Sequence, residues 1–310
     1  MNPSLLGLFA TSGLTALIYQ VVWTRWLGLL LGNFATATAT VVTTYMAGLA
    51  LGNLLFGRAA GRLDARGALR LYAGLEGALA ALAAASPLLI ASSSPLYATL
   101  AAASGSPVIR AALGAALLLP PTILMGGTLP AMVRAAGVAD PSALGLLYAV
   151  NTIGAAAGPL LAAFGLIPLA GLRRTCWIAA LLNVAVAAVA FRLARGRSAS
   201  SPVVEPTVAS PPDAALSLPG VPPTLPYVLA ALSGFLALAF EIALTRLIVL
   251  IVTGGSVYGF AIILSAFLAG LALGAWLLRL FPPPSPRAAL AGFAAAQLAV
   301  WLFSLTTPFW

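Results

Sequence analysis

The chain has 310 residues, of which 62% are hydrophobic and 7% are charged, and its formal net charge is +9. Soluble domains carry roughly 25% charged residues, so this composition excludes an ordinary soluble domain and requires a lipid bilayer around most of the surface. All basic residues are Arg, there is no His, and Cys176 is the only Cys. These counts exclude Cys-His metal sites and disulfides within the chain, and we expect no metal or other cofactor.

The hydropathy pattern predicts an all-α polytopic membrane protein, because about 20 apolar residues suffice for one spanning helix. The first hydrophobic run is too long for the core of a signal peptide, so it should remain as a membrane helix. Residues 93–107 are small, polar and interrupted by Gly and Pro, and we expect a loop there with at most one short helix. Nine spanning helices are predicted, at about residues 5–25, 35–57, 69–92, 110–134, 143–169, 173–193, 227–250, 256–280 and 287–306.

Two stretches of the chain repeat each other. SGLTALIYQVVWTRWL begins at Ser12 and SGFLALAFEIALTRLI at Ser233, an offset of 221 residues (233 − 12), while AGLALG occurs at 47–52 and again at 269–274, an offset of 222. Internal repeats of hydrophobic segments are typical of transporter folds. We therefore expect the two SG…TR helices to lie near each other at the centre of the bundle.

The repeat suggests three parts. Residues 1–194 are expected to form a complete six-helix unit, and residues 227–310 a partial second unit of three helices that is incomplete relative to the first. Residues 195–226 contain eight prolines between Pro202 and Pro226, and such a composition predicts an extended linker.

Arginine placement predicts the orientation of the helices, because cytoplasmic loops are enriched in basic residues. The loop after the second helix and the end of the sixth are both basic, whereas Arg173 and Arg174 fall on the opposite side and disagree. We therefore expect the N-terminus and the linker to be cytoplasmic. The loop after the second helix is either a conformational latch or an ordinary basic loop in which Asp64 caps the next helix; its charged residues are Arg58, Arg62, Asp64, Arg66 and Arg70.

Arg25 and Arg246 occupy equivalent positions near the outer ends of the two repeated helices. An ionisable residue within a span is costly and often functional. Trp23 and Trp26 flank Arg25, however, and both residue types anchor helices at the membrane interface. We interpret these four residues as interface anchors, with functional arginines as the alternative.

Glu76 and Glu241 are the only acids expected well inside the hydrocarbon region. They are candidates for binding a proton or a small cation, and the alternative is that each is a structural acid that is hydrogen-bonded inside the bundle. Gln20 is the counterpart of Glu241 in the first repeat and is expected to approach it as a neutral partner. Asn151 is expected to form a hydrogen bond between helices.

The sequence PPTILMGGTLP at 120–130 is the densest cluster of helix-breaking residues. We expect it to interrupt its helix, and interrupted membrane helices often line a substrate cavity, although the interruption could equally only shape the bundle. Small-residue pairs such as Gly48/Gly52 and Gly270/Gly274 are expected to pack helices together. The residues of the expected helix break are Pro120, Pro121, Gly126, Gly127 and Pro130.

Several of these blocks resemble the membrane domain of fused major-facilitator-like/spermidine-synthase proteins. They are the two SG…TR segments, AGLALG, LPPTILMGGTLPAMVRA from Leu119 and LLYAVNTIGAAAGPLLAAFGLIPLAGLRRT from Leu146. The resemblance covers the chain except the linker. One position departs from it: the family usually has an acid after the aromatic residue of the first helix, where this chain has Gln20, although the second copy keeps Glu241.

The resemblance implies a major-facilitator-like arrangement in a bacterial cytoplasmic membrane. The soluble synthase domain of that family is not recognisable here, since no G-x-G-x-x-G turn follows a strand pattern and the chain has only six acids. We therefore expect no enzymatic activity, and no binding of nucleic acid.

The leading hypothesis is a membrane module that anchors or serves a partner, either a synthase domain or other membrane subunits. The alternatives are a secondary transporter of a small cation such as a polyamine, and a structural subunit of a larger assembly.

Overall fold

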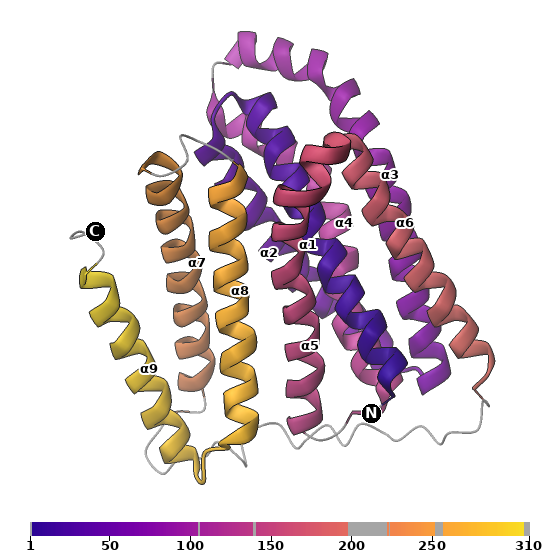
Figure 1. Cartoon of the computed structure of the whole chain (residues 1–310), viewed down its shortest axis with the longest axis vertical. Helices are drawn as coiled ribbons and strands as arrows, with labels where there is room; N and C mark the ends of the chain where they lie inside the picture. The colour runs from indigo at the N-terminus through magenta and orange to yellow at the C-terminus, as the bar shows by residue number, and fades with distance from the viewer. Residues whose placement is uncertain are drawn as a thin grey trace.

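The computed structural model describes residues 2–104, 106–138, 141–197, 222, 224–251 and 257–306. Within these residues it is helical with short connections and contains no strand. The elements are α1 (Pro3–Leu31), α2 (Phe34–Gly61), α3 (Ala65–Ser104), α4 (Pro107–Ala136), α5 (Pro141–Leu160), a π-helix (Leu161–Leu166), α6 (Ile167–Arg195), α7 (Leu225–Ile251), α8 (Val257–Leu280) and α9 (Pro286–Thr306) (Figure 1).

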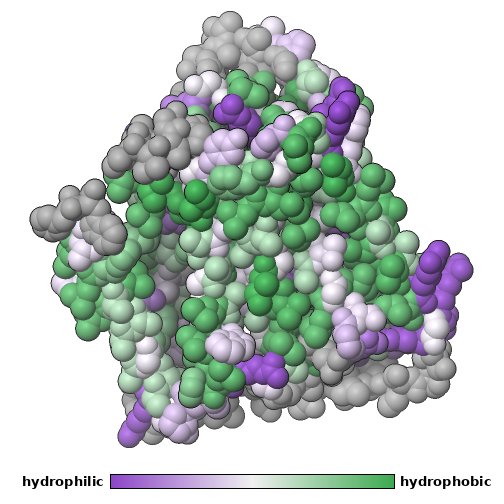
Figure 2. Space-filling model, viewed as in Figure 1, coloured by the Kyte–Doolittle hydropathy of each residue, from purple (hydrophilic) through white to green (hydrophobic). Residues whose placement is uncertain are grey.

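Eight of the helices in the described residues are long and apolar enough to cross a membrane, when α5, the π-helix and α6 are counted as one 54-residue helix. That continuous helix folds back on itself at Gly171, whose φ of 76° lies in the left-handed region (Figure 1). Gly171 falls between the fifth and sixth predicted spans, and glycine adopts this conformation without a steric cost from a Cβ atom. Green, hydrophobic side chains cover most of the visible surface of the helices (Figure 2), as expected for a multi-pass membrane protein.

Side-chain caps fix the ends of several helices. Asn2 accepts a hydrogen bond from the backbone N–H of Ser4 at the start of α1, and Asn33 accepts two from the start of α2. Asp64 accepts a hydrogen bond of 2.7 Å from the backbone N–H of Gly67, so it caps α3 as the sequence predicted. These caps satisfy backbone donors that the helices themselves cannot pair.

The predicted loop at 93–107 is wrong, because α3 continues as a helix to Ser104 and α4 begins at Pro107. Pro87 and Pro95 both lie inside α3. The hydroxyl groups of Ser92 and Ser93 donate to the carbonyl oxygens three residues earlier. The carbonyl of Ala83, which has no backbone N–H donor at Pro87, accepts instead from the hydroxyl of Ser86 over 2.8 Å, as side chains do in proline-containing membrane helices.

The helix is not interrupted at 120–130 either. Pro120, Pro121 and Pro130 lie inside a continuous α4. Prolines remove N–H donors, yet the helix continues past them. The hydroxyl of Thr122 shares its hydrogen between the carbonyl oxygens of Leu118 and Leu119, both at 2.9 Å. The predicted helix break is therefore wrong, because these prolines disturb the helix less than the sequence suggested.

Helix α1 lies at the centre of the bundle, where 72% of its most apolar window is buried. It packs against α2, α5 and α6, while α2 packs on α4, α3 on α4 and α6, and α8 on α5. Two apolar clusters form the core, one around Tyr19 and Trp23 and the other around Phe9 and Tyr72. In contrast, none of the residues of α9 is buried. The predicted linker lies almost entirely outside the described residues.

Glycines set the distance between helices in the first part of the chain. A Cβ atom on Gly52 would lie 1.9 Å from the backbone oxygen of Ile123, and one on Gly126 would lie 2.3 Å from the backbone oxygen of Leu49. The backbones of α2 and α4 therefore touch, as small-residue pairs permit. The same hexapeptide in α8 behaves differently, because a Cβ atom on Gly270 or Gly274 would meet nothing within 4 Å.

Candidate functional site: a central cavity between the two repeats

A cavity of about 400 Å³ lies between helices α1, α2, α4 and α5 and the α7–α8 pair. Its lining is mainly apolar, as is usual for sites that bind small molecules. Among the described lining residues, Glu241 is the single ionisable carboxylate, and none is an arginine. The cavity therefore places one acid in apolar surroundings at the centre of a membrane protein.

The two repeats line this cavity with equivalent residues. Each lining residue of α7 has a lining counterpart in α1 at an offset of 221. The lining residues of α8 except Leu264 have lining counterparts in α2 at an offset of 222. The repeated helices α1 and α7 thus turn equivalent faces toward the cavity. Only α1 lies at the centre of the bundle, so the expectation that both helices lie there is wrong for α7, which is mostly exposed and does not pack on α1. The pairs are Gly13/Gly234, Ala16/Ala237, Leu17/Leu238, Gln20/Glu241, Tyr45/Phe267, Met46/Leu268 and Leu49/Leu271.

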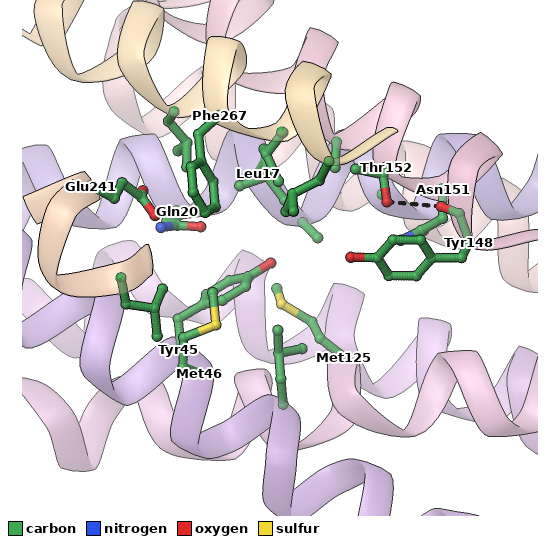
Figure 3. A pocket seen from close by; sticks show the side chains of 18 of the residues that line it. Leu17, Gln20, Tyr45, Met46, Met125, Tyr148, Asn151, Thr152, Glu241 and Phe267 are labelled. Carbon is green, nitrogen blue, oxygen red and sulfur yellow. Dashed lines mark hydrogen bonds between the residues drawn. The ribbon is translucent and has the colours of Figure 1, made fainter. Parts of the chain in front are cut away.

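Gln20 and Glu241 form one polar end of the cavity. Figure 3 shows the ends of their side chains pointing toward one another. Both are buried, with 1% and 4% of their surface exposed. Within the described part of the chain, neither the amide oxygen nor the amide nitrogen of Gln20 has a hydrogen-bond partner. A buried polar group without a partner costs roughly 1–3 kcal/mol, so this amide is poised to bind a group that enters the cavity.

The other end of the cavity is built by α5 and the start of α1. Figure 3 shows Tyr148, Asn151 and Thr152 there, with Leu17 and Met125 between them and Gln20. Asn151 packs closely on α1, since a Cβ atom on Gly13 would lie 2.8 Å from its side-chain oxygen. Its predicted role as a donor between helices stays a prediction. The sequence had not singled out Tyr148 or Thr152, because a Tyr or a Thr in an apolar helix is too common to signal a site.

Glu76 lies outside the cavity in a separate polar cluster. It is 0% exposed, and its two carboxylate oxygens accept hydrogen bonds from the hydroxyl of Ser12 and the amide of Asn183. Tyr19 donates a hydrogen bond of 2.9 Å to the side-chain oxygen of Asn183. Ser12 also lines the cavity, so it alone joins the carboxylate of Glu76 to the central site. The sequence had missed Asn183, whose signal was its isolation in an otherwise apolar stretch.

The predicted interface anchors have different environments. Trp23 is completely buried, stacks on Tyr19 with ring centroids 5.3 Å apart, and donates to Ser86 over 3.1 Å. Its assignment as an interface anchor is therefore wrong, because its side chain points into the core rather than toward lipid. Trp26 and Arg25 are half-buried and Arg246 is exposed, and their anchoring role stays a prediction.

None of the charged residues of the basic loop between α2 and α3 lines the central cavity. Arg62 and Arg70 are exposed, and Arg66 is half-buried. Arg134 of α4 donates a hydrogen bond of 2.6 Å to the carbonyl of Leu63, which ties this loop to α4. The hypothesis of a conformational latch stays a prediction.

The proline and glycine residues expected to form a helix break line no part of the central cavity. Pro120 and Pro121 border a smaller cavity of about 140 Å³ between α3 and α4. Gly126 and Gly127 pack against Leu49 and Phe56 of α2. The segment nevertheless borders the central cavity through Met125 and Thr128, while its glycines are used for helix packing.

Comparison with known proteins adds no neighbour: no family model, no curated protein and no solved structure matches this chain.

Proposed function

We propose that this protein is a membrane carrier that binds a small organic cation in the central cavity, as a secondary transporter does. The observation that carries the proposal is that Glu241 and Gln20 lie together at one end of an apolar cavity, and that the amide of Gln20 has no hydrogen-bond partner among the described residues. Acids buried within membrane spans are expensive and mark substrate or proton pathways. A cation with N–H donors would pair with the carboxylate and with the amide oxygen.

The repeat supports the same proposal. Carriers commonly place their substrate site where two repeated units face each other near the middle of the membrane, and seven pairs of equivalent residues face this cavity. A major-facilitator-like arrangement in a bacterial cytoplasmic membrane, with the N-terminus inside, belongs to this proposal. No catalytic step is assigned to the chain.

Binding of hexylammonium to the purified protein in lipid nanodiscs tests the proposal. Isothermal titration calorimetry should detect saturable binding, and Glu241→Gln should weaken it at least tenfold, because hydrogen bonds to charged groups contribute about 1.5–3 kcal/mol and about 1.4 kcal/mol corresponds to tenfold in affinity. Asp64→Asn is the matched control, since it removes one acid at the cap of α3, outside the cavity. Equal binding by the Glu241→Gln variant and the wild type would contradict the proposal.

Transport is tested separately in proteoliposomes. Uptake of labelled hexylammonium should exceed the leak of protein-free vesicles and should fall to that leak in Glu241→Gln. Binding without uptake would contradict a transport function and leave a membrane protein that only binds the cation.

A second candidate is a membrane module that serves a partner, either a synthase domain or other membrane subunits. Two observations favour it: the glycine face of α8 at Gly270 and Gly274 has no neighbour within 4 Å, and α9 has no buried residue. In the first repeat the glycines of the same hexapeptide pack directly against α4. If a partner helix occupies the α8 face, the native size of the complex extracted from its own membrane should drop in Gly274→Leu. An unchanged size would remove this candidate.

A further inference from the structure

The Ser and Thr hydroxyl groups along the cavity share one property: each has already donated its hydrogen. Ser12 donates to the carboxylate of Glu76, Thr128 to the carbonyl of Met125 at 2.7 Å, and Thr152 to the carbonyl of Tyr148 at 2.8 Å. A hydroxyl has a single hydrogen and two acceptor lone pairs. Toward the cavity these three residues therefore offer acceptors only.

Two of these acceptors lie at the end of the cavity away from Glu241. Thr152 is adjacent to Asn151, which packs on Gly13, the neighbour of Ser12. From Gly13 to Gln20 the chain advances seven residues along α1, which corresponds to about 10 Å at 1.5 Å per residue. The two polar ends of the cavity are thus separated by about two turns of helix, with apolar residues between them.

Glu76 reinforces the acceptor character of this second end. Its carboxylate lies directly behind the Ser12 hydroxyl and holds the hydrogen of that hydroxyl on the side away from the cavity. The Asn183 amide donates to the other carboxylate oxygen of Glu76, and the Tyr19 hydroxyl in turn donates to the side-chain oxygen of Asn183. Because hydrogen bonds in such a chain polarise one another, the Ser12 oxygen is a better acceptor than an isolated hydroxyl.

We propose that the cavity binds elongated organic cations that carry a second hydrogen-bond donor about 10 Å from the positive charge. The ammonium group binds Glu241 and Gln20, the donor at the far end binds the oxygens of Ser12 and Thr152, and the apolar middle contacts Leu17 and Met125. This inference rests on the proposed cation-binding function and specifies the ligand class of the same site. Tyr148 and Asn151 add hydrogen-bond donors at this end, so a far-end group that both donates and accepts fits best. A far-end carboxylate only accepts and would leave the oxygens of Ser12 and Thr152 without a donor.

Three ligand series that differ only at the far end test this specificity on the wild-type protein. They are n-alkylammonium ions, the ω-amino alcohols and the ω-amino acids of matched length, each titrated by calorimetry in nanodiscs. One net hydrogen bond corresponds to roughly 2- to 10-fold in affinity. We expect an amino alcohol to bind up to about tenfold more tightly than the alkylammonium ion at one chain length, and the amino acid to bind more weakly than both.

The outcomes separate this inference from the proposed function. Binding of all three series with equal affinity at every length would overturn the two-ended site and leave the cation-binding proposal intact. Preference for the amino acid would overturn the acceptor assignment. Absence of binding in every series would overturn both proposals.

Variants at the second end locate the effect. Thr152→Val keeps the shape of the side chain and removes its oxygen, so it should reduce the advantage of the amino alcohol over the alkylammonium ion. Thr152→Ser restores an oxygen and should restore that advantage. Ser12→Ala should reduce the advantage as well, and because the readout is a ratio of two affinities, a general loss of folded protein does not imitate it. An unchanged ratio in both Thr152→Val and Ser12→Ala would refute the placement of the second end.

Discussion

The two copies of AGLALG should respond in opposite ways to the same substitution. In Gly52→Ala, the new Cβ atom would lie 1.9 Å from the backbone oxygen of Ile123 and 2.9 Å from the Cα atom of Gly126. Both obstacles belong to the backbone, so α2 and α4 have to separate. In Gly274→Ala, the new Cβ atom meets nothing within 4 Å.

The magnitudes follow from these contacts. Overpacking typically costs about 1–3 kcal/mol, and since the Gly52 contacts involve backbone atoms, we expect the upper end of that range for Gly52→Ala. Alanine in a helix interior is more favourable than glycine by about 0.5–1 kcal/mol, so Gly274→Ala should be neutral or stabilising. The propensity gain is common to both substitutions, so the expected difference between them is the overpacking cost of about 3 kcal/mol.

Reversible unfolding in mixed detergent micelles, titrated with sodium dodecyl sulfate and followed by circular dichroism, measures both free energies. Gly126→Ala is the reciprocal control, because its Cβ atom would lie 2.3 Å from the backbone oxygen of Leu49, and it should be as destabilising as Gly52→Ala. If Gly52→Ala and Gly274→Ala changed the unfolding free energy equally, the close approach of α2 and α4 would be refuted.

Three further predictions concern the buried polar cluster, the orientation and the absence of enzymatic activity. Asn183→Leu should lower the unfolding free energy by at least about 1 kcal/mol, because it leaves one oxygen of Glu76 without its donor, and an unchanged free energy would contradict that role. In intact cells, a membrane-impermeant thiol reagent should label Ser104→Cys but not Ser200→Cys, since the arginine bias places the linker inside; the reverse pattern would invert the topology. The purified chain should show no aminopropyl transfer and should not bind a sulfonium nucleoside, and calorimetric detection of such binding would overturn the non-enzymatic assignment.

The sequence predicted most of the helices because hydropathy and length determine them almost alone. It failed at residues 93–107 and 120–130, where proline and glycine suggested breaks. Side-chain hydroxyl groups bond to backbone carbonyls near residue 93, and tertiary packing accompanies the continuous helix at 120–130. Gly126 shows the packing most directly, because its missing side chain admits α2 instead of breaking α4.

The site was only partly predictable. The repeat was enough to propose that Gln20 and Glu241 approach each other, since equivalent faces of repeated helices point the same way. Hydropathy could not show that Trp23 points inward, because a tryptophan near a helix end suits a core and a membrane interface equally well. Nor could it connect Glu76 to Ser12, since that contact joins residues 64 positions apart.

The repeat places the carboxylate of the cavity on the more weakly packed of its two equivalent helices. In α7 only 11% of the most apolar window is buried, against 72% in α1. Regions with little buried surface open at the lowest free-energy cost, so displacing α7 should cost less free energy than displacing α1. Such a displacement would move the carboxylate of Glu241 relative to Gln20 and change the electric field in the cavity, while the core around α1 stays packed.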